Sequence, residues 1–229
     1  MSDFYQTAEE RFQDWNYDHP KILHGLIRSL KPAVAVEIGT YRGYAACYMA
    51  RAIQENNCGH LFCIDNFSLL DHVERYGDPV AHWEENLRQA GVREWATLLK
   101  GDVAEVEWPK RVDFAYIDGW HSYQACKSDA ERCMALGAEC ITFDDVLTTV
   151  GPRKYFAELS EDPAWQCILI QRDGGLGIAY RKMPMRRVEF IQELPDHPGQ
   201  TLHAMNDAEV KEQIKAAAKV TGLDYRGVL

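Results

Sequence analysis

Two acidic clusters and one histidine form the part of this sequence best suited to chemistry. Asp118 and His121 stand three residues apart, and Asp144 and Asp145 are adjacent. If the strands that carry them are neighbours, three carboxylates crowd one small volume, which costs free energy unless a cation or a proton compensates. Three oxygen ligands suit Mg²⁺ or a similar hard cation, and His121 can accept a hydroxyl proton near neutral pH. The alternative is that Asp144 or Asp145 caps a helix and that His121 is a loop residue.

A second signal is the loop from Gly39 to Gly43, which contains Thr40 and Tyr41 and follows an apolar segment with Glu37 near its end. Glycine lets the backbone approach a ligand closely, and the start of a helix offers free N–H groups. The GxxxG spacing does not match the dinucleotide fingerprint GxGxxG, which disfavours NAD. Glu37 would repel a pyrophosphate but suits a cationic ligand group. An ordinary strand-to-helix turn is the alternative.

Two further aspartates follow apolar segments of strand length. Asp65 lies 22 residues after Gly43, where an acidic side chain can accept hydrogen bonds from ribose hydroxyls, and Asp102 follows Gly101. Each aspartate alone could be a solvated loop residue or a helix cap. Three such features in chain order at strand ends indicate a ligand site at the carboxyl edge of an open α/β sheet.

The elements that would position these residues alternate between strands and amphipathic helices, which is typical of a parallel sheet covered on both faces. Strands are expected at 34–38, 61–64, 96–99, 114–117, 140–143, 167–171 and 177–181, and helices at 19–30, 43–54, 79–90, 123–136 and 153–159. The turn at Asp173-Gly174-Gly175 predicts a hairpin between the last two strands. The predicted fold class is α/β: a Rossmann-like, doubly wound, seven-stranded sheet, mostly parallel, with one antiparallel strand near the edge.

Composition narrows the class of protein. A chain of 229 residues with 46% hydrophobic and 26% charged residues suits one globular α/β domain. The formal net charge of -10 disfavours a nucleic-acid partner, and no apolar stretch reaches the roughly 20 residues that span a bilayer. The start of the chain lacks an apolar signal region, and the seven cysteines show no CxxC pair. We therefore expect a cytoplasmic protein with reduced, mostly buried thiols and no zinc site.

The two ends of the chain differ from its centre. Residues 1–182 are expected to form one catalytic domain with an N-terminal helical extension. Residues 183–229 form a polar tail, helical around 207–219, that packs on the domain or on a partner. Aromatic residues near the N-terminus and the polar tail suggest a contact surface, so we hypothesise a homo-oligomer.

Four segments together resemble a known family: Val36–Gly43, Asp65, Asp118–Tyr123 and Phe143–Asp145. They look like the class I S-adenosylmethionine-dependent methyltransferases. More narrowly, they resemble metal-dependent O-methyltransferases of the macrocin and mycinamicin sugar type, with the catechol O-methyltransferases as more distant relatives. The likeness covers about residues 20–182. It implies methyl transfer from S-adenosylmethionine to the hydroxyl of a small molecule, a sugar or natural product, with Mg²⁺ or another divalent cation.

The resemblance also implies roles for single residues in binding the cofactor. Glu37, Gly39 and Gly43 would line its methionine end, Asp65 would hold the ribose, and Asp102 would lie near the adenine. The remaining expected cofactor contacts are Thr40, Tyr41, Asn66 and Asp118.

By the same resemblance, Asp118, Asp144 and Asp145 would ligate the metal and His121 would act as the base. The catechol-type enzymes have a lysine where His121 stands and an asparagine where Asp145 stands, and these departures favour a sugar or aliphatic hydroxyl. The segment 66–83 is expected to cover the site. Its aromatic residues, Trp83 among them, would contact the acceptor or serve as packing, and contact is the interpretation favoured.

Three other functions remain open at this level. The first is a metal-independent methyltransferase with His121 as base. The second is a protein that binds S-adenosylmethionine without catalysis. The third, an NAD-dependent enzyme, is disfavoured by the missing glycine. Methylation of nucleic acid or amides is also disfavoured, because no NPPY-like loop follows the segment 114–117.

Overall fold

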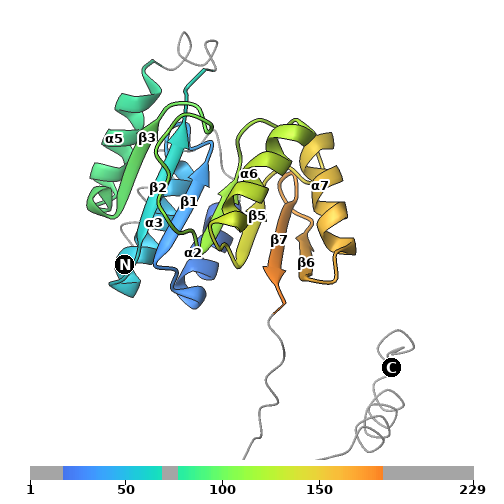
Figure 1. The fold of residues 1–229 in the computed structure, drawn as a ribbon. Coiled ribbons are helices and arrows are strands. Elements are labelled where there is room, and N and C mark those ends of the chain that lie inside the picture. Colours follow the sequence, from blue (N-terminus) through green and yellow to red (C-terminus); the bar gives the residue numbers. More distant parts are fainter. Residues whose placement is uncertain (1–17, 69–76, 183–229) are drawn as a thin grey trace, which may run out of the picture. The chain divides into compact units, whose positions relative to one another are not determined.

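A seven-stranded sheet forms the centre of the described chain. The computed structural model describes residues 18–68 and 77–182 (Figure 1). The strands lie in the order β3-β2-β1-β4-β5-β7-β6. Their bounds are β1 (Val34–Ile38), β2 (His60–Asp65), β3 (Ala96–Lys100), β4 (Phe114–Ile117), β5 (Cys140–Phe143), β6 (Trp165–Ile170) and β7 (Leu176–Arg181). Only β7 runs antiparallel to its neighbours, β5 and β6. The predicted fold class is confirmed.

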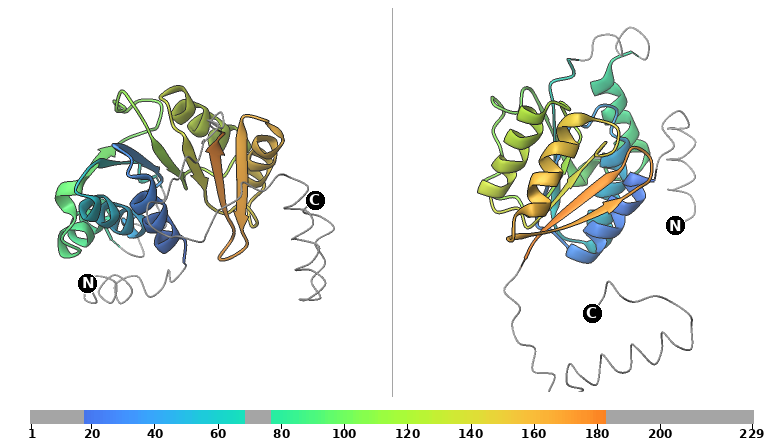
Figure 2. Two further views of the ribbon diagram at one scale, coloured as in Figure 1. Left: turned by 90° about the horizontal axis from the view of Figure 1, so that it is seen from below. Right: turned by 90° about the vertical axis from the view of Figure 1, so that its right-hand side faces the viewer.

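Helices cover both faces of this sheet (Figures 1 and 2). They are α2 (His19–Leu30), α3 (Tyr44–Asn56), α5 (Pro79–Gln89), α6 (Tyr123–Ala135) and α7 (Val150–Glu161), with a short 3-10 helix, η2 (Arg93–Trp95). Most predicted bounds agree within two residues. Helix α7 begins three residues earlier than predicted, because Pro152 is accommodated in its first turn, where a missing N–H costs no hydrogen bond.

Side chains that alternate along the strands pack into two hydrophobic cores. One core joins the sheet to α2, α3 and α5, with Leu23 and Trp83 among its buried side chains. The other joins the opposite face to α6 and α7, with Cys133 and Phe156 among its members. Strands β4 and β5 are buried along their whole length, as expected for central strands covered on both faces.

Local signals start the helices that flank the site. The Asp78 side chain accepts a hydrogen bond from Val80 N at 2.9 Å at the start of α5. The Ser122 hydroxyl accepts one from Ala125 N at 3.2 Å at the start of α6. Such caps satisfy N–H groups that have no partner within the helix. They fix where each loop ends and the helix begins.

The register of the sheet lines up the strand ends. Ile38 is paired with Ile64 on β2 and with Ile117 on β4, and Ile117 is paired with Phe143 on β5. The residues that follow these four are Gly39, Asp65, Asp118 and Asp144. Parallel strands in register therefore deliver one glycine and three aspartates to the same edge of the sheet.

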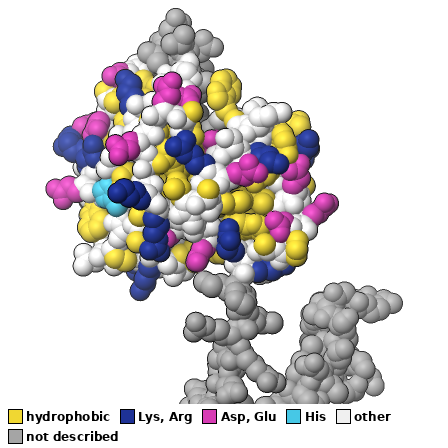
Figure 3. Space-filling model, viewed as in Figure 1, with side chains coloured by type: hydrophobic (Ala, Val, Ile, Leu, Met, Phe, Trp, Pro, Cys, Tyr) yellow, Lys and Arg dark blue, Asp and Glu magenta, His cyan; other side chains and the backbone are white. Residues whose placement is uncertain are grey.

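The surface and the thiols agree with the composition. Basic and acidic side chains are interspersed on the face seen in Figure 3. All seven cysteines are free, and five are buried, as predicted. Within residues 18–68 and 77–182, no helix has the length and apolar character needed to cross a bilayer.

The described residues all lie in the first of two compact units, Met1–Pro184 and Met185–Leu229. The expected N-terminal extension, the tail from 183 and its helix at 207–219 fall outside them. The division at 182, like the homo-oligomer, stays a prediction.

Candidate active site

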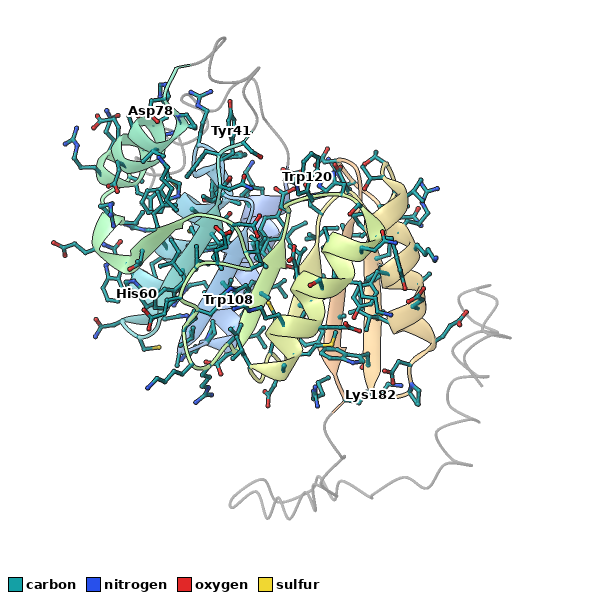
Figure 4. The ribbon with its side chains drawn as sticks, turned by 45° about the horizontal axis from the view of Figure 1, so that its top comes forward. Tyr41, His60, Asp78, Trp108, Trp120 and Lys182 are labelled. Carbon is teal, nitrogen blue, oxygen red and sulfur yellow. The ribbon has the colours of Figure 1, made fainter. Side chains whose placement is uncertain are left out.

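The loops after β1, β2, β4 and β5 meet at the carboxyl edge of the sheet. Figure 4 shows Tyr41 and Trp120, from the loops after β1 and β4, at this edge, and His60 and Lys182 toward the opposite one. Ligands of open α/β sheets bind at the carboxyl ends of the strands. The predicted site residues thus share one edge.

The glycine loop is held in a shape that only glycine takes without strain. Gly39 and Gly43 have φ angles of 85° and 83°. A Cβ atom on Gly39 would lie 2.1 Å from the carbonyl oxygen of Asp118, so the loops after β1 and β4 are in direct contact. The Thr40 hydroxyl accepts a hydrogen bond from the indole of Trp83 at 2.9 Å. Trp83 is fully buried there and packs beneath the loop, which is the packing alternative for this residue. Residues 69–76 of the expected cover lie outside the described residues, so acceptor contact by the rest of the segment stays a prediction.

Glu37 is an acidic side chain inside the core. It is 1% exposed, and its Oε2 atom has no hydrogen-bond partner. Burial raises the pKa of Glu37 to about 7, although hydrogen bonds with Thr40 and Cys63 act in the opposite direction. An unsatisfied buried carboxylate oxygen is costly unless a donor or cation reaches it. This orphaned oxygen beside the glycine loop fits the cationic aminoacyl end of S-adenosylmethionine.

Asp65 ties two loops together. Its Oδ2 accepts a hydrogen bond from Tyr41 N and its Oδ1 one from Phe67 N, both at 2.7 Å. Each carboxylate oxygen has a second lone pair, so these bonds leave capacity for ribose hydroxyls. Asn66 accepts a hydrogen bond from Ser68 N at 3.0 Å and so shapes the same loop. Their predicted cofactor contacts stay predictions.

Asp102 follows β3 in a tight turn. Its Oδ1 accepts a hydrogen bond from Ala104 N at 2.9 Å, and the preceding Gly101 donates from its backbone to Asp65 O at 2.9 Å. The side chain therefore has the turn-forming role that was its alternative interpretation. Its second oxygen is not used in this turn, and its place near an adenine stays a prediction.

Asp118 and Asp144 form a carboxyl pair at the ends of β4 and β5. Burial raises the pKa of Asp118 well above its ordinary value, and the charge of Asp144, the charge of Glu37 and a hydrogen bond with Asp144 add to the rise. Tyr116 donates a further, long hydrogen bond to Asp118 Oδ2 at 3.3 Å. Two carboxyls in contact cannot both ionise without a large cost. The ionised form of Asp118 is therefore disfavoured in this arrangement.

His121 lies between two of the predicted carboxylates. Its Nε2 is 3.6 Å from Asp118 Oδ1, and its Nδ1 is 3.5 Å from Asp145 Oδ2. The Nε2 atom is buried and has no hydrogen-bond partner. The structure thus brings together the histidine and the two aspartates that the sequence placed in one site.

Asp145 also shapes the turn into α7. It adopts a φ of 55°, which is unusual for a residue other than glycine. Its Oδ1 accepts a hydrogen bond from the Thr148 hydroxyl at 2.7 Å, and its backbone oxygen accepts one from Thr149 N at 2.9 Å. One carboxylate oxygen is committed to the turn and the other faces His121. Asp145 therefore shapes the turn without capping α7, whose N-cap is Thr149 with no side-chain cap hydrogen bond, and its predicted site role stays a prediction.

His19 is the site residue that the sequence reasoning missed. It begins α2 and is 0% exposed, with Nδ1 2.5 Å from Asp144 Oδ1 and Nε2 2.9 Å from Arg172 O. Burial lowers the pKa of His19, but the hydrogen bond to Asp144 and its charge outweigh burial and raise it. The signal available in the sequence was the spacing of His19 from two apolar residues of the same helix, at intervals of four residues. His19 shares the apolar stripe of Leu23 and Ile27, where a histidine must find buried partners.

The three predicted metal ligands, Asp118, Asp144 and Asp145, have partners within the protein. Within the described ranges, no three His, Cys, Asp or Glu side chains are placed to hold a metal ion. In this arrangement Asp144 pairs with His19 and Asp118, and Asp145 bonds to Thr148. Metal ligation by Asp118, Asp144 and Asp145 stays a prediction.

Exposed apolar side chains flank His121. Trp120 is 70% exposed and precedes it directly, while Val150 is 77% and Leu147 38% exposed after β5. Gly151 lies against the backbone of His121, where a Cβ atom would be 2.2 Å from the His121 oxygen. The start of α7 and the loop after β4 are therefore in contact, and together they present apolar surface beside the histidine.

Comparison with known proteins agrees with this geometry. Residues 36–146 match the model of a family described as a methyltransferase domain. That range runs from the middle of β1 to just beyond Asp145 and contains every predicted site residue. The sequence matches none of the curated proteins with which it was compared.

Solved structures share the fold at low sequence identity. The O-methyltransferase TomG of Streptomyces achromogenes, involved in tomaymycin synthesis and solved with S-adenosylmethionine, is 20% identical; the match covers 80% of this chain and 89% of that one, with a TM-score of 0.58. The O-methyltransferase of Bacillus cereus, solved with S-adenosylhomocysteine, is 18% identical, with coverages of 79% and 90% and a TM-score of 0.58. The fold that the resemblance implied is confirmed, and the match to a methyltransferase domain agrees with it.

Proposed function

We propose that this chain, which has the fold of the S-adenosylmethionine-dependent O-methyltransferases, transfers a methyl group from S-adenosylmethionine to a hydroxyl of a small molecule. The observation that carries the proposal is His121, held between Asp118 and Asp145 beside the glycine loop. The fold supports the cofactor, and the histidine supports a hydroxyl acceptor, whose proton must leave during the reaction.

The residues around the glycine loop would hold the cofactor. Glu37 offers an unpaired, buried carboxylate oxygen to a cationic group, and Gly39 and Gly43 let the loop pack tightly against the Asp118 backbone and against Trp83 and Leu87. Asp65 retains lone pairs for ribose hydroxyls. When bound, the cofactor supplies an electrophilic methyl carbon on a sulfonium.

The protein's own part in the reaction is to position the acceptor and take its proton. The acceptor oxygen forms a bond to the methyl carbon while the carbon–sulfur bond breaks and its electron pair stays on sulfur. The hydroxyl proton passes to His121, whose Nε2 has no other partner. Asp145 stabilises the resulting imidazolium from the Nδ1 side, at 3.5 Å. Positioning two reactants in line accounts for much of the rate in such a transfer.

The acceptor is proposed to have an apolar face. Trp120, Leu147 and Val150 are exposed around His121, and an exposed indole suits stacking against an aromatic or sugar ring. A ring seated there would direct its hydroxyl toward the histidine. A sugar or another hydroxylated natural product meets this requirement.

The first experiment is calorimetric titration of S-adenosylhomocysteine into the full chain, followed by methyl transfer to a panel of hydroxylated ring compounds. We expect micromolar binding and turnover with at least one acceptor. His121→Ala should lower turnover by a factor of about 100 or more and change cofactor affinity less than about threefold. The control, His60→Ala, changes a histidine at the start of β2, toward the opposite edge of the sheet, and should leave both unchanged.

The outcomes separate the competing functions. Binding without turnover on any acceptor favours a cofactor-binding protein without catalysis. If S-adenosylhomocysteine does not bind, the proposed function is wrong. Turnover that survives His121→Ala would mean that another group accepts the proton.

A further inference from the structure

Asp129 is a buried acidic side chain that has no part in the proposed reaction. It lies on α6, is 7% exposed, and makes no hydrogen bond or ion pair with any other residue of the described ranges. Burial raises the pKa of Asp129 to about 6; the charge of Asp102 adds to the rise, and the charge of Arg132 opposes it. A buried carboxyl without a hydrogen bond costs free energy, so a donor group on a ligand would find a favourable partner here.

Arg132, three residues further along the same helix, is close enough in sequence to pair with Asp129 but has other partners. Its guanidinium donates a hydrogen bond to Val103 O at 2.8 Å and lies over the Trp108 ring, 4.6 Å from the ring centroid. The Trp108 indole also donates to Val103 O, at 2.9 Å. These contacts fasten the segment after β3 to α6 beside Asp129, and they turn the guanidinium away from the carboxyl.

Asp129 also lies beside the loop after β4. A Cβ atom on Gly119 would be 3.8 Å from Asp129 Oδ2, and Gly119 directly follows Asp118 at the carboxyl edge of the sheet. On its other side, the carboxyl is near enough to Asp102, in the loop after β3, for the two charges to interact. The Asp129 carboxyl therefore lies between the loops that follow β3 and β4.

The nucleoside end of the cofactor is the ligand group that would reach this position. Asp65, the expected ribose contact, ends β2, and its backbone oxygen accepts a hydrogen bond from Gly101 N at 2.9 Å, one residue before Asp102. A base attached to that ribose would have the loops after β3 and β4 at its sides. The amino group of adenine carries two N–H donors. Asp102 has one oxygen committed to Ala104 N at 2.9 Å, whereas neither oxygen of Asp129 has a partner among the described residues.

We propose that Asp129 recognises the adenine of the cofactor by accepting a hydrogen bond from its amino group, and that it selects adenine over a purine without that group. This inference rests on the proposed function, because it concerns the same cofactor. Asp129 is a specificity-determining residue, since it would contact the base and not the reacting methyl group. A site built to bond an N–H group rejects an analogue that lacks it, because the buried acceptor is then left unpaired.

The test compares two ligands by calorimetry on the full chain: S-adenosylhomocysteine, and its analogue with hydrogen in place of the 6-amino group. The titrations are made at about pH 8, where a carboxyl with a pKa of about 6 is ionised. The wild type should bind S-adenosylhomocysteine at least about tenfold more tightly than the analogue. Asp129→Leu removes the acceptor, so it should bind S-adenosylhomocysteine at least about tenfold more weakly than the wild type and bind the analogue no more weakly. Asp129→Asn, which keeps a carbonyl acceptor without the charge, should show an intermediate preference.

Glu131→Gln is the matched control, because Glu131 lies on the same helix, is exposed and pairs with Lys127 at 3.8 Å. Its preference between the two ligands should equal that of the wild type. Urea denaturation checks the fold of Asp129→Leu, which should be at least as stable as the wild type because the carboxyl it removes has no partner in the free protein.

The preference between the two ligands separates recognition of the base from a structural role. If Asp129 only supports the fold of the site, Asp129→Leu would weaken both ligands alike and keep the preference, which would overturn the inference. A wild type that binds both ligands equally would also overturn it. In either case S-adenosylhomocysteine still binds and the proposed function stands; if it does not bind the wild type at all, the proposed function is wrong and this inference is wrong with it.

Discussion

Acidic groups at the carboxyl edge of this sheet are stabilised in different ways. Asp144 is paired with the buried His19, the pKa of Asp118 is raised by burial and by the charge of Asp144, and Asp145 divides its oxygens between Thr148 and His121. Glu37 has the fourth arrangement: a buried carboxyl with one oxygen unpaired. Of the four, Glu37 is the group whose ionisation a cationic ligand would change most, because nothing in the described protein compensates its second oxygen.

Glu37 should therefore make cofactor binding depend on pH. Burial raises its pKa to about 7 in the free protein, and a cationic ligand favours the ionised form. Affinity for S-adenosylhomocysteine should accordingly rise about tenfold between about pH 6 and pH 8, as the carboxyl loses its proton. Calorimetry across this range provides the measurement. Glu37→Gln should bind more weakly and keep only the pH dependence that belongs to the ligand; an equally steep rise in both proteins would contradict the role of Glu37.

At the scale of elements, the glycine loop and the strand ends could be predicted, and the N-terminal helix contact could not. Asp118, His121 and Asp145 follow strands that the alternating pattern places side by side, so their meeting follows from the sheet. The His19–Asp144 contact joins residues 125 positions apart, and helix periodicity gives only the buried face of α2. Which strand that face meets depends on the packing of the whole sheet. The Asp65 and Asp102 hydrogen bonds were likewise beyond prediction, because they depend on the backbone path of two loops.

Two glycines in neighbouring elements should respond in opposite ways to the same substitution. Gly39→Ala forces a positive φ on alanine and places its Cβ atom against the Asp118 carbonyl, so we expect a loss of about 2–4 kcal/mol in unfolding free energy. Gly25→Ala, in the exposed interior of α2 with no atom near the new Cβ, should gain about 0.5–1 kcal/mol. Urea denaturation compares the two variants. Equal effects would mean that the loop after β1 does not have this conformation.

At the scale of the whole molecule, the reactivity of the cysteine thiols measures how well the two hydrophobic cores are shielded from solvent. Burial raises the pKa of Cys126 and of Cys140, each to about 12, so these thiols are both inaccessible and protonated at neutral pH. Cys58, in the turn between α3 and β2, is the exposed one among the seven. Because the reactive species of a thiol is its anion, reactivity should differ sharply among these sites.

Ellman's reagent should modify one thiol rapidly in the native protein, and Cys58→Ser should remove that phase. Cys167, which is partly buried, should follow more slowly. The other five should react only with the rate of unfolding, and urea should release them together if both cores open in one transition. Early reaction of Cys126 and Cys133 alone would show that the face covered by α6 and α7 opens independently.

The contacts of His19 with residues far along the chain affect when the site can form during synthesis of the protein. His19 binds Asp144 and the backbone of Arg172, which lie 125 and 153 residues after it. At about 5–20 residues per second, a ribosome adds that stretch in roughly six to thirty seconds. Throughout this interval the imidazole has left the exit tunnel but its partners have not. The start of α2 cannot make these contacts until β6 and the residues after it have been synthesised, so the electrostatics of the site are completed only after that point.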